Sequence, residues 1–202
     1  QNLKDMDDDE LADIRNKHLG FVFQSFYLMP KLTALDNVAL PLLYAGVSLK
    51  ERRERAAEAL KAVGLEERMD FFPNQLSGGQ CQRVAIARAI VLNPKYLFCD
   101  EPNSGLDPKT SLVIDELLHG ITEEFGMTTI INTHDMNSVM GIGDNISFIC
   151  EGRKEWEGDK TMVISATNEK LNDLVFASEL FKEVKRVEME KLARQGSISS
   201  TR

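Results

Sequence analysis

The sequence has few cysteines and no excess of basic residues, and each of these shortages argues against a class of protein. Its 202 residues include only 3 cysteines, which have neither the even count of a disulfide framework nor the close spacing of a metal knuckle. Lys and Arg number 24 against 32 Asp and Glu, and the net charge of −8 argues against a nucleic-acid partner held by a basic face. The composition therefore fits a globular protein of a reducing cytoplasm.

The sequence also has no long apolar run. Its longest, Val38–Val47, is short and is interrupted by Pro41, whereas a membrane span needs about 20 apolar residues. We therefore expect the chain to associate with a membrane only through a partner. The first residue is Gln1 rather than Met, and we expect an N-terminal portion to precede it.

Three apolar runs predict the strands of a parallel sheet. Leu19–Gln24 has the pattern of a buried strand that arrives at a site, Tyr96–Cys99 that of a strand buried on both faces, and Met127–Thr133 that of a second buried strand. Between the last two, apolar residues recur at helical spacing from Pro108 until Gly126. A strand–helix–strand crossover makes the sheet parallel, and ligands bind at the carboxyl ends of such strands.

Between these strands, residues 31–92 predict a largely helical block. Thr33 and Ser48 are each followed three residues later by an acid, which is capping-box spacing, and Gly64 suits a left-handed helix end. A third helix follows in the stretch NQLSGGQCQRVAIARA, Asn74 to Ala89. The block therefore has the size of a compact helical lobe inserted into the sheet domain.

The C-terminal part differs from the preceding residues in its sequence pattern. ISFIC and RKEW predict a hairpin that turns at Glu151 and Gly152, and two helices are expected at Glu169–Phe176 and Glu179–Ala193. We expect five parts in all. They are a partial core at 1–30, a helical subdomain at 31–92, the rest of the core at 93–158, a helical extension at 159–195 and a disordered tail at 196–202.

Charged side chains follow two of the predicted strands directly. Asp100 and Glu101 come after the first, and His134 after the second. Taken alone, the two acids could simply be solvated and the histidine structural. Together they supply what phosphoanhydride hydrolysis needs: Asp100 to hold Mg²⁺ through water, Glu101 to orient the attacking water and His134 to hydrogen-bond the γ-phosphate.

The stretch LSGGQ lies at the start of the third predicted helix. The free N–H groups and the positive dipole end of a helix start bind anions. Gly78 and Gly79 lack a Cβ, so that phosphate oxygens can approach the backbone, and Ser77 adds a hydroxyl. An N-cap serine with flexible neighbours would explain a bare SGG. The following QRVAIARA favours the phosphate site.

In these motifs, the chain resembles the nucleotide-binding subunit of an ABC transporter, and the resemblance covers roughly Leu19 to Ile149. The resemblance implies an α/β fold of the P-loop NTPase type, a parallel sheet with an inserted helical subdomain. It also implies a homodimer of such subunits that sandwiches ATP and Mg²⁺. The implied site residues are Gln24 as Q-loop glutamine and Mg²⁺ ligand, Leu76, Ser77, Gly78, Gly79 and Gln80 as signature motif, Asp100 as Walker B acid and Mg²⁺ ligand, Glu101 as catalytic base, Asp107 in the D-loop and His134 as switch histidine.

Three features depart from the family pattern. Asn103 stands where threonine is usual, and Cys81 where glutamine or glutamate is commoner. More seriously, the 202 residues contain no G-x-x-x-x-G-K-[ST] motif, so the first strands, the adenine-stacking aromatic and the P-loop are expected to precede Gln1. We expect the 202 residues alone to bind ATP poorly and not to hydrolyse it.

The resemblance also implies a partner and a substrate class. The stretch from Gly20 to Ala89 is similar to the ATPases of lipoprotein-release and macrolide-export systems, and Phe98 to Ile149 to the ATPase of an outer-membrane lipid-asymmetry system. A composite joined near Pro94 stays open. We expect transport of an envelope lipid, lipoprotein or amphiphile, with integral membrane permease subunits contacting Phe26 to Pro30 at the inner face of the cell membrane.

Other interpretations of the loop after Gln24 and of the function remain open. Phe26 to Pro30 could be local core under a loop instead of a contact surface. The chain could also be a non-transport ABC ATPase of DNA repair or chromosome organisation, but the spacing from Gln24 to Ser77 leaves no room for a long coiled coil. A third reading is a non-catalytic remnant of an ABC protein.

Overall fold

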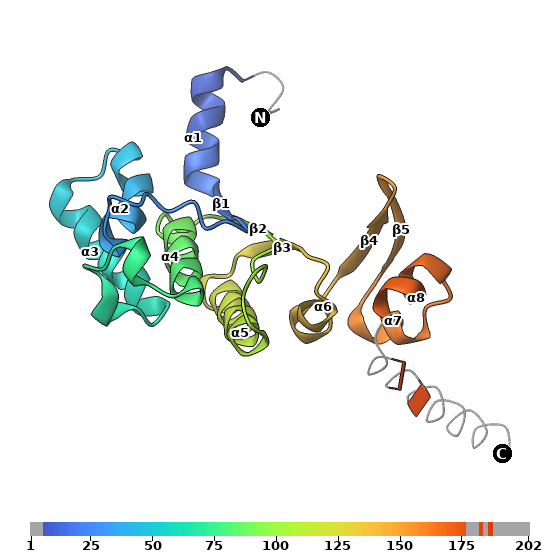
Figure 1. Ribbon diagram of the computed structural model, residues 1–202. Coiled ribbons are helices and arrows are strands. Elements are labelled where there is room, and N and C mark those ends of the chain that lie inside the picture. The colour runs from blue at the N-terminus through green and yellow to red at the C-terminus, as the bar shows by residue number, and fades with distance from the viewer. Residues whose placement is uncertain (1–5, 177–181, 184–185, 188–202) are drawn as a thin grey trace, which may run out of the picture. The chain divides into compact units, whose positions relative to one another are not determined.

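The computed structural model describes residues 6–176, 182–183 and 186–187. The chain divides into two compact units, Gln1–His134 and Asp135–Arg202, which are described separately. Figure 1 shows the path of the chain through both of them. The expected helix Glu179–Ala193 lies almost entirely outside the described residues, and the expected tail 196–202 lies wholly outside them.

The first unit is built on a three-stranded parallel sheet. Its strands are β1 (Leu19–Val22), β2 (Tyr96–Asp100) and β3 (Thr128–Asn132), in the order β1-β2-β3. The helix α5 (Pro108–Phe125) connects β2 to β3 and ends at Gly126, which has the left-handed φ of 60°. The predicted crossover and the parallel sheet are therefore confirmed.

The predicted helical block consists of three helices and two short 3-10 turns. The helices are α2 (Ala34–Tyr44), α3 (Leu49–Ala62) and α4 (Gly78–Ile90). Thr33 and Ser48 cap α2 and α3 as expected, because each side chain accepts a hydrogen bond from the backbone N–H three residues on. The 3-10 turns Glu66–Arg68 and Pro73–Gln75 connect α3 to α4.

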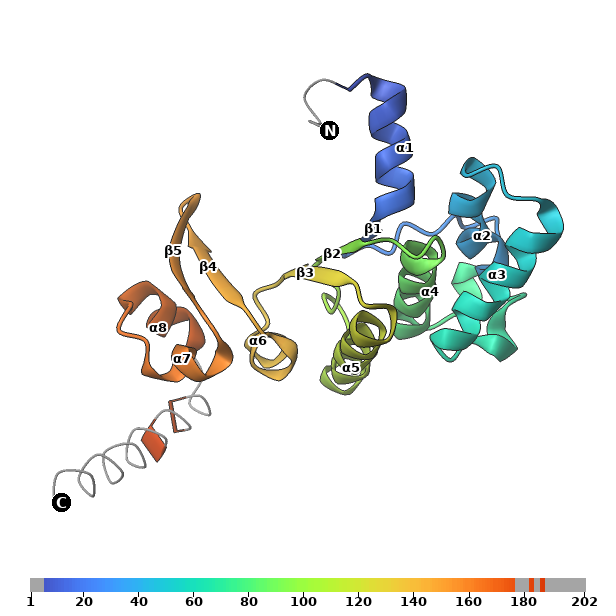
Figure 2. The same cartoon turned by 180° about the vertical axis from the view of Figure 1, so that it is seen from behind.

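The core of the first unit lies on one face of the sheet. Leu97 and Cys99 of β2 are buried together with apolar residues of α4 and α5, and Figures 1 and 2 show both helices on the same side of the strands. On the other face, Phe21 is 40% and Ile130 51% exposed. The expectations that β2 is buried on both faces and that β3 is a buried strand are therefore wrong, since alternate side chains point to opposite faces and the described helices pack against only one.

An N-terminal helix, α1 (Asp8–His18), was not predicted. Asp7 and Glu10 form a reciprocal capping box at its start, and the helix leads directly into β1. Its first turn is acidic and its last turn basic, which suits the helix dipole. The acidic run that begins at Asp7 is thus a helix start.

The second unit packs a hairpin with three short helices: α6 (Met136–Ile142), β4 (Ile146–Cys150), β5 (Arg153–Gly158), α7 (Lys160–Ser165) and α8 (Glu169–Val175). The antiparallel hairpin turns at Glu151 and Gly152, both with positive φ, as predicted. The expected helix at Glu169–Phe176 is also confirmed. No helix in the described part of the chain is both long and apolar enough to cross a membrane.

Candidate active site

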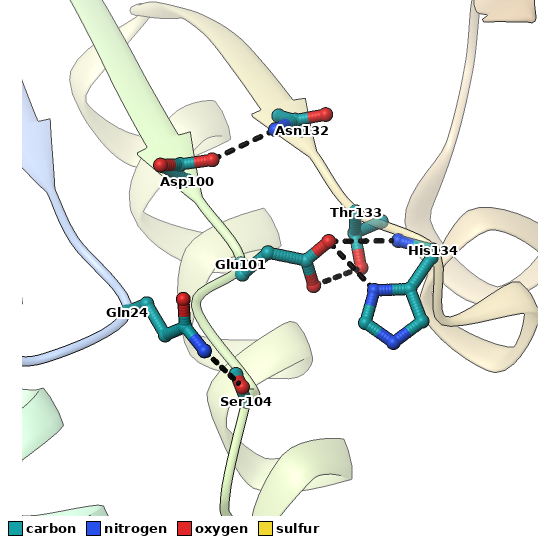
Figure 3. A network of polar contacts seen from close by, with 7 residues as sticks. All are labelled: Gln24, Asp100, Glu101, Ser104, Asn132, Thr133 and His134. Carbon is teal, nitrogen blue, oxygen red and sulfur yellow. Dashed lines mark hydrogen bonds and ion pairs between the residues drawn. The ribbon is translucent and has the colours of Figure 1, made fainter. Parts of the chain in front are cut away.

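The carboxyl ends of β2 and β3 bring the first polar residues together. Asp100 and Asn132 are directly paired in the register of the two strands. Asn132 Nδ2 donates a hydrogen bond of 2.7 Å to Asp100 Oδ1 (Figure 3). This amide fixes one carboxylate oxygen of Asp100, and Oδ2 takes no part in the bond.

Glu101 and His134, the predicted base and switch histidine, are in direct contact. His134 Nδ1 lies 2.7 Å from Glu101 Oε1, and the backbone N–H of His134 donates to the same oxygen at 3.1 Å. The Thr133 hydroxyl donates to Oε2 at 3.4 Å. Because an ionised carboxylate only accepts hydrogen bonds, the contact requires a proton on Nδ1, and Figure 3 shows the other ring nitrogen turned away from Glu101.

The backbone at Glu101 is unusual. Its φ is 47°, in the left-handed region that non-glycine residues rarely adopt, and its N–H donates to Asn132 O at 2.8 Å. Strained residues of this kind persist only where their surroundings hold them, and they cluster at functional sites. The Glu101 side chain is 21% and that of His134 80% exposed, so the pair opens to solvent on the histidine side.

Gln24 lies just beyond the end of β1, at the same sheet edge. Its Nε2 donates to the Ser104 hydroxyl at 2.8 Å, which leaves the amide oxygen for another partner. The described residues contain no cluster of three or more His, Cys, Asp or Glu that could hold a metal ion. One carboxylate and one amide oxygen nevertheless fit Mg²⁺, which keeps most of its water ligands. Gln24 and Asp100 as Mg²⁺ ligands stay a prediction.

The signature stretch forms the start of α4. Ser77 is its N-cap, and Ser77 and Gln80 form a full capping box in which each side chain accepts from the other's backbone N–H, at 3.3 and 2.9 Å. Ser77 and Gly78 are exposed, whereas Leu76 is partly buried and packs against the core. Ser77 therefore caps the helix, as the simpler explanation holds. The phosphate role of Leu76 to Gln80 stays a prediction.

Gly79 has a reason for lacking a side chain that the sequence did not reveal. The residue is buried, and a Cβ there would lie 2.4 Å from Thr110 Cγ2 of α5. A Cβ at Gly78 would meet only the end of the Leu106 side chain, at 3.3 Å. The close approach at Gly79 is therefore made by the protein itself, and Gly78 is the glycine whose backbone is open to a ligand.

Asp107 of the predicted D-loop is the N-cap of α5. Its carboxylate accepts from the backbone N–H groups of Lys109 and Thr110 at 3.1 and 3.0 Å and from the Thr110 hydroxyl. These bonds, that of the Thr110 hydroxyl first, lower the pKa of Asp107 below its ordinary value. Thr110 thus touches both Asp107 and Gly79, and it joins the D-loop to the signature helix. The predicted nucleotide contact of Asp107 remains untested.

Three residues of the site escaped the sequence analysis. Asn132 is the last residue of β3 and Thr133 follows it, so both are polar residues at the strand end, the same signal that identified His134. Gln82 is fully buried in α4, and its Nε2 donates to Pro102 O at 2.6 Å, immediately after Glu101. A glutamine inside a helix gives no sequence signal for such a contact.

The two substitutions relative to the family pattern are accommodated by packing. Asn103 is 8% exposed, and its Nδ2 donates to Asp115 Oδ1 at 2.7 Å. Cys81 is buried, its Sγ lies 3.5 Å from Pro73 O, and burial raises the pKa of its thiol. Burial also raises the pKa of Cys99 to about 12. Cys81 and Cys99 therefore act as apolar core residues and not as nucleophiles.

Comparisons with known proteins agree with these motifs. The family described as "ABC transporter" matches residues 2–104. The ABC transporter ATP-binding protein MJ0796 of Methanocaldococcus jannaschii is 51% identical over 157 residues, which are 76% of this chain and 66% of that protein. Its structure, described as a dimeric post-hydrolysis state of the ATP-binding cassette bound to ADP and Pi, matches with a TM-score of 0.68 at 48% identity and covers 77% of this chain and 68% of that one.

Relatives with assigned transport roles match nearly as well. The lipoprotein-releasing system protein LolD of Bdellovibrio bacteriovorus is 48% identical over 136 residues, 67% of this chain and 62% of LolD. The methionine import protein MetN of Desulfitobacterium hafniense is 42% identical over 184 residues, 89% of this chain and 54% of MetN. The chain thus spans about half to two thirds of the length of these relatives. With its α/β fold, parallel sheet and matched residues, the chain belongs to the ABC transporter ATP-binding family.

Proposed function

We propose that the complete protein is the ATP-hydrolysing subunit of an ABC transporter. The observation that carries the proposal is the contact between Glu101 and His134 beside Asp100, where the carboxyl ends of β2 and β3 meet. A carboxylate that can orient water, next to an exposed imidazole and to a second carboxylate that can hold Mg²⁺, supplies groups that phosphoanhydride hydrolysis requires. The similarity to a cassette whose structure is described as bound to ADP and Pi supports it.

Each residue has a role that follows from its atoms. Mg²⁺, when bound, would offset the charge of the phosphates. Asp100 Oδ2 and the amide oxygen of Gln24 are the atoms of this chain that would hold it, the carboxylate through water. Glu101 accepts a hydrogen bond from the attacking water and orients it, which typically contributes about 10² to 10⁴-fold in rate. His134 Nε2 would contact the γ-phosphate.

We also propose that two copies share each nucleotide. The capping box uses the backbone N–H groups of Ser77 and Gln80, so the exposed start of α4 offers the backbone N–H of Gly78 and the positive end of the helix dipole. Such a surface suits the terminal phosphate of a nucleotide held by a second copy. The structure of MJ0796, described as dimeric, supports this arrangement.

The loop after Gln24 is the proposed contact with integral membrane permease subunits. Tyr27 is 62% and Met29 50% exposed, while Leu28 between them packs against the core. Met and aromatic side chains suit an adaptable interface. The contact would hold the subunit at the inner face of the cell membrane.

An envelope lipid, lipoprotein or amphiphile is the substrate class that we propose. The similarity to LolD supports a lipoprotein or a related amphiphile. MetN is similar over a larger share of the chain, and its name gives methionine import, so methionine is the competing cargo. Measuring nucleotide hydrolysis with purified permease in lipoprotein-containing and methionine-containing vesicles would separate the two classes.

The catalytic proposal is tested by Glu101→Gln in the protein expressed from its entire reading frame. The amide keeps the size of the side chain but is a poor base, so we expect phosphate release to fall at least about 10²-fold while ATP binding persists. Glu116→Gln, an exposed position of α5, is the matched control. A wild-type protein that binds ATP without releasing phosphate would indicate a non-catalytic remnant.

A further inference from the structure

The loop between β1 and α2 contains two consecutive residues in an unfavourable backbone conformation. Phe26 has a φ of 55° and Tyr27 a φ of 46°, both in the left-handed region that residues with a Cβ avoid. Neither is a glycine or an asparagine, for which the conformation would be easier. The surrounding structure must therefore hold this segment in place.

Local backbone bonds from the Phe26 and Tyr27 N–H groups contribute, and the group from outside the loop that holds it is the guanidinium of Arg88. Arg88 Nη1 donates to Tyr27 O and Nη2 donates to Phe26 O, each at 2.7 Å. The two acceptors are the carbonyls of the two strained residues. Burial lowers the pKa of Arg88, so these bonds also compensate a partly desolvated charge. Only a planar fork with fixed donors fits two adjacent carbonyls in this way, and a lysine cannot replace it.

Arg88 belongs to the last turn of α4, the helix that begins at the signature stretch. Ser77 and Arg88 are 11 residues apart, about 16 Å along one helix at about 1.5 Å per residue. Val84 and Ile86 between them are fully buried. A well-packed helix of this length moves as a rigid body, so a displacement at Ser77 is transmitted to the Arg88 guanidinium.

We propose that Arg88 is a positioning residue that couples the signature end of α4 to the exposed loop at Phe26 and Tyr27. The inference rests on the proposed function for its consequence, because the same loop is the proposed permease contact. Arg88 touches neither nucleotide nor partner in this proposal. It fixes the conformation in which Tyr27 faces the partner, and it links that conformation to the position of the helix start that faces the phosphate.

The first test measures loop opening and needs no ATPase activity. Chymotrypsin cleaves after Phe and Tyr, so the rate of cleavage after Phe26 and Tyr27 in the native full chain reports on local opening. Arg88→Gln keeps one donor group and Arg88→Met keeps none at similar length. We expect cleavage to be faster in Arg88→Gln than in the wild type and fastest in Arg88→Met, by at least about tenfold, the change expected when even one of the two charge-assisted bonds is lost.

Arg83→Lys is the matched control, because Arg83 is on the same helix and donates to Val63 O at 3.4 Å, away from the loop. Its cleavage after Phe26 and Tyr27 should equal that of the wild type. Urea unfolding of each variant separates local from global effects. If cleavage after Phe26 and Tyr27 rises no more than the global loss of stability requires, or is unchanged, the positioning role is overturned.

The second test measures coupling in the complete protein with its permease. Arg88→Lys keeps the charge and loses the fork, so we expect an unchanged KM for ATP and unchanged basal kcat, with loss of most of the stimulation by permease. Equal loss of basal and stimulated kcat would overturn the coupling. If the wild type hydrolyses no ATP, the proposed function fails, and the proteolysis of the loop still decides whether Arg88 positions it.

Discussion

The helical lobe and the strand ends use polar side chains in opposite ways. In the lobe, Asn37 is fully buried and bonds only to backbone atoms, donating to three carbonyls and accepting from the N–H of Met29 at 2.7 Å. At the strand ends, Glu101 and His134 bond to each other, and the histidine is largely exposed. Asn37 thus stabilises the fold, whereas Glu101 and His134 are positioned for another partner.

The contrast implies that substitutions in the two regions should affect different measurements. A lobe residue should change the free energy of unfolding, and a strand-end residue should change catalysis without changing stability. The segment around Thr110, which touches both the signature glycine and Asp107, lies between these extremes.

The largest effect is expected at His134. His134→Ala in the complete protein removes the proposed contact to the γ-phosphate, in which Nε2 donates when both ring nitrogens carry a proton, and we expect kcat to fall about 10² to 10³-fold. The urea midpoint should change little, because exposed side chains typically contribute within about 0.5 kcal/mol. Steady-state phosphate release and urea unfolding are the two measurements. His119→Ala on the exposed face of α5 is the control, and a large loss of stability in His134→Ala would contradict the comparison.

Asn37→Ala should show the opposite pattern. The substitution leaves buried backbone groups of the 29–33 loop without their side-chain partner, each costing about 1 to 3 kcal/mol. We expect the free energy of unfolding to fall by about 3 kcal/mol. Urea denaturation of the 202-residue chain measures it, with the exposed Asn74→Ala as control. A loss below about 1 kcal/mol would show that water replaces the amide at no cost.

Gly79→Ala tests the intermediate region. The new Cβ would meet Thr110 Cγ2, and overpacking of this kind typically costs about 1 to 3 kcal/mol. Thr110→Ser removes that methyl group and keeps the hydroxyl bonded to Asp107, so the double variant should recover most of the stability lost by Gly79→Ala. Gly78→Ala is the matched control and should be milder. No recovery in the double variant would assign the loss to backbone conformation.

The smallest effect concerns the pH dependence of stability at Asp107. Hydrogen bonds hold the pKa of this carboxyl below its ordinary value of 3.8 in the folded chain, so the unfolded chain binds the proton more readily. The resulting stability is present above about pH 3.8 and is lost as the pH falls through the lower folded pKa. Asp107→Asn still caps α5, but its free energy of unfolding, measured by urea denaturation, should fall less steeply than that of the wild type as the pH is lowered from 5 to 2. Parallel profiles would contradict it.

The sequence predicted the elements of the fold well wherever local chemistry sets their bounds. Thr33, Ser48 and Gly126 end or begin helices through their own side chain or backbone, so their type identifies them. The edge that gathers Asp100 and His134 also followed from the order of strands and helices. These features depend on neighbours in the chain, which periodicity and capping residues report.

What the sequence could not predict depends on distant contacts. The positive φ of Glu101 follows from the hydrogen bonds that enclose it, and not from its residue type. An apolar strand such as β2 does not reveal which of its faces is covered, so Phe98 was expected to be buried and is only partly so. Arg88 lies 61 residues from Tyr27, and no spacing rule connects them.

The burial of Cys81 and Cys99 has a practical consequence. Thiol-directed reagents attack the thiolate, and burial both shields these two side chains and raises their pKa. Cys150, at the end of β4, is only partly buried. A maleimide fluorophore should therefore attach at Cys150 in the unaltered chain, which gives a single spectroscopic reporter on the hairpin unit without any engineered cysteine.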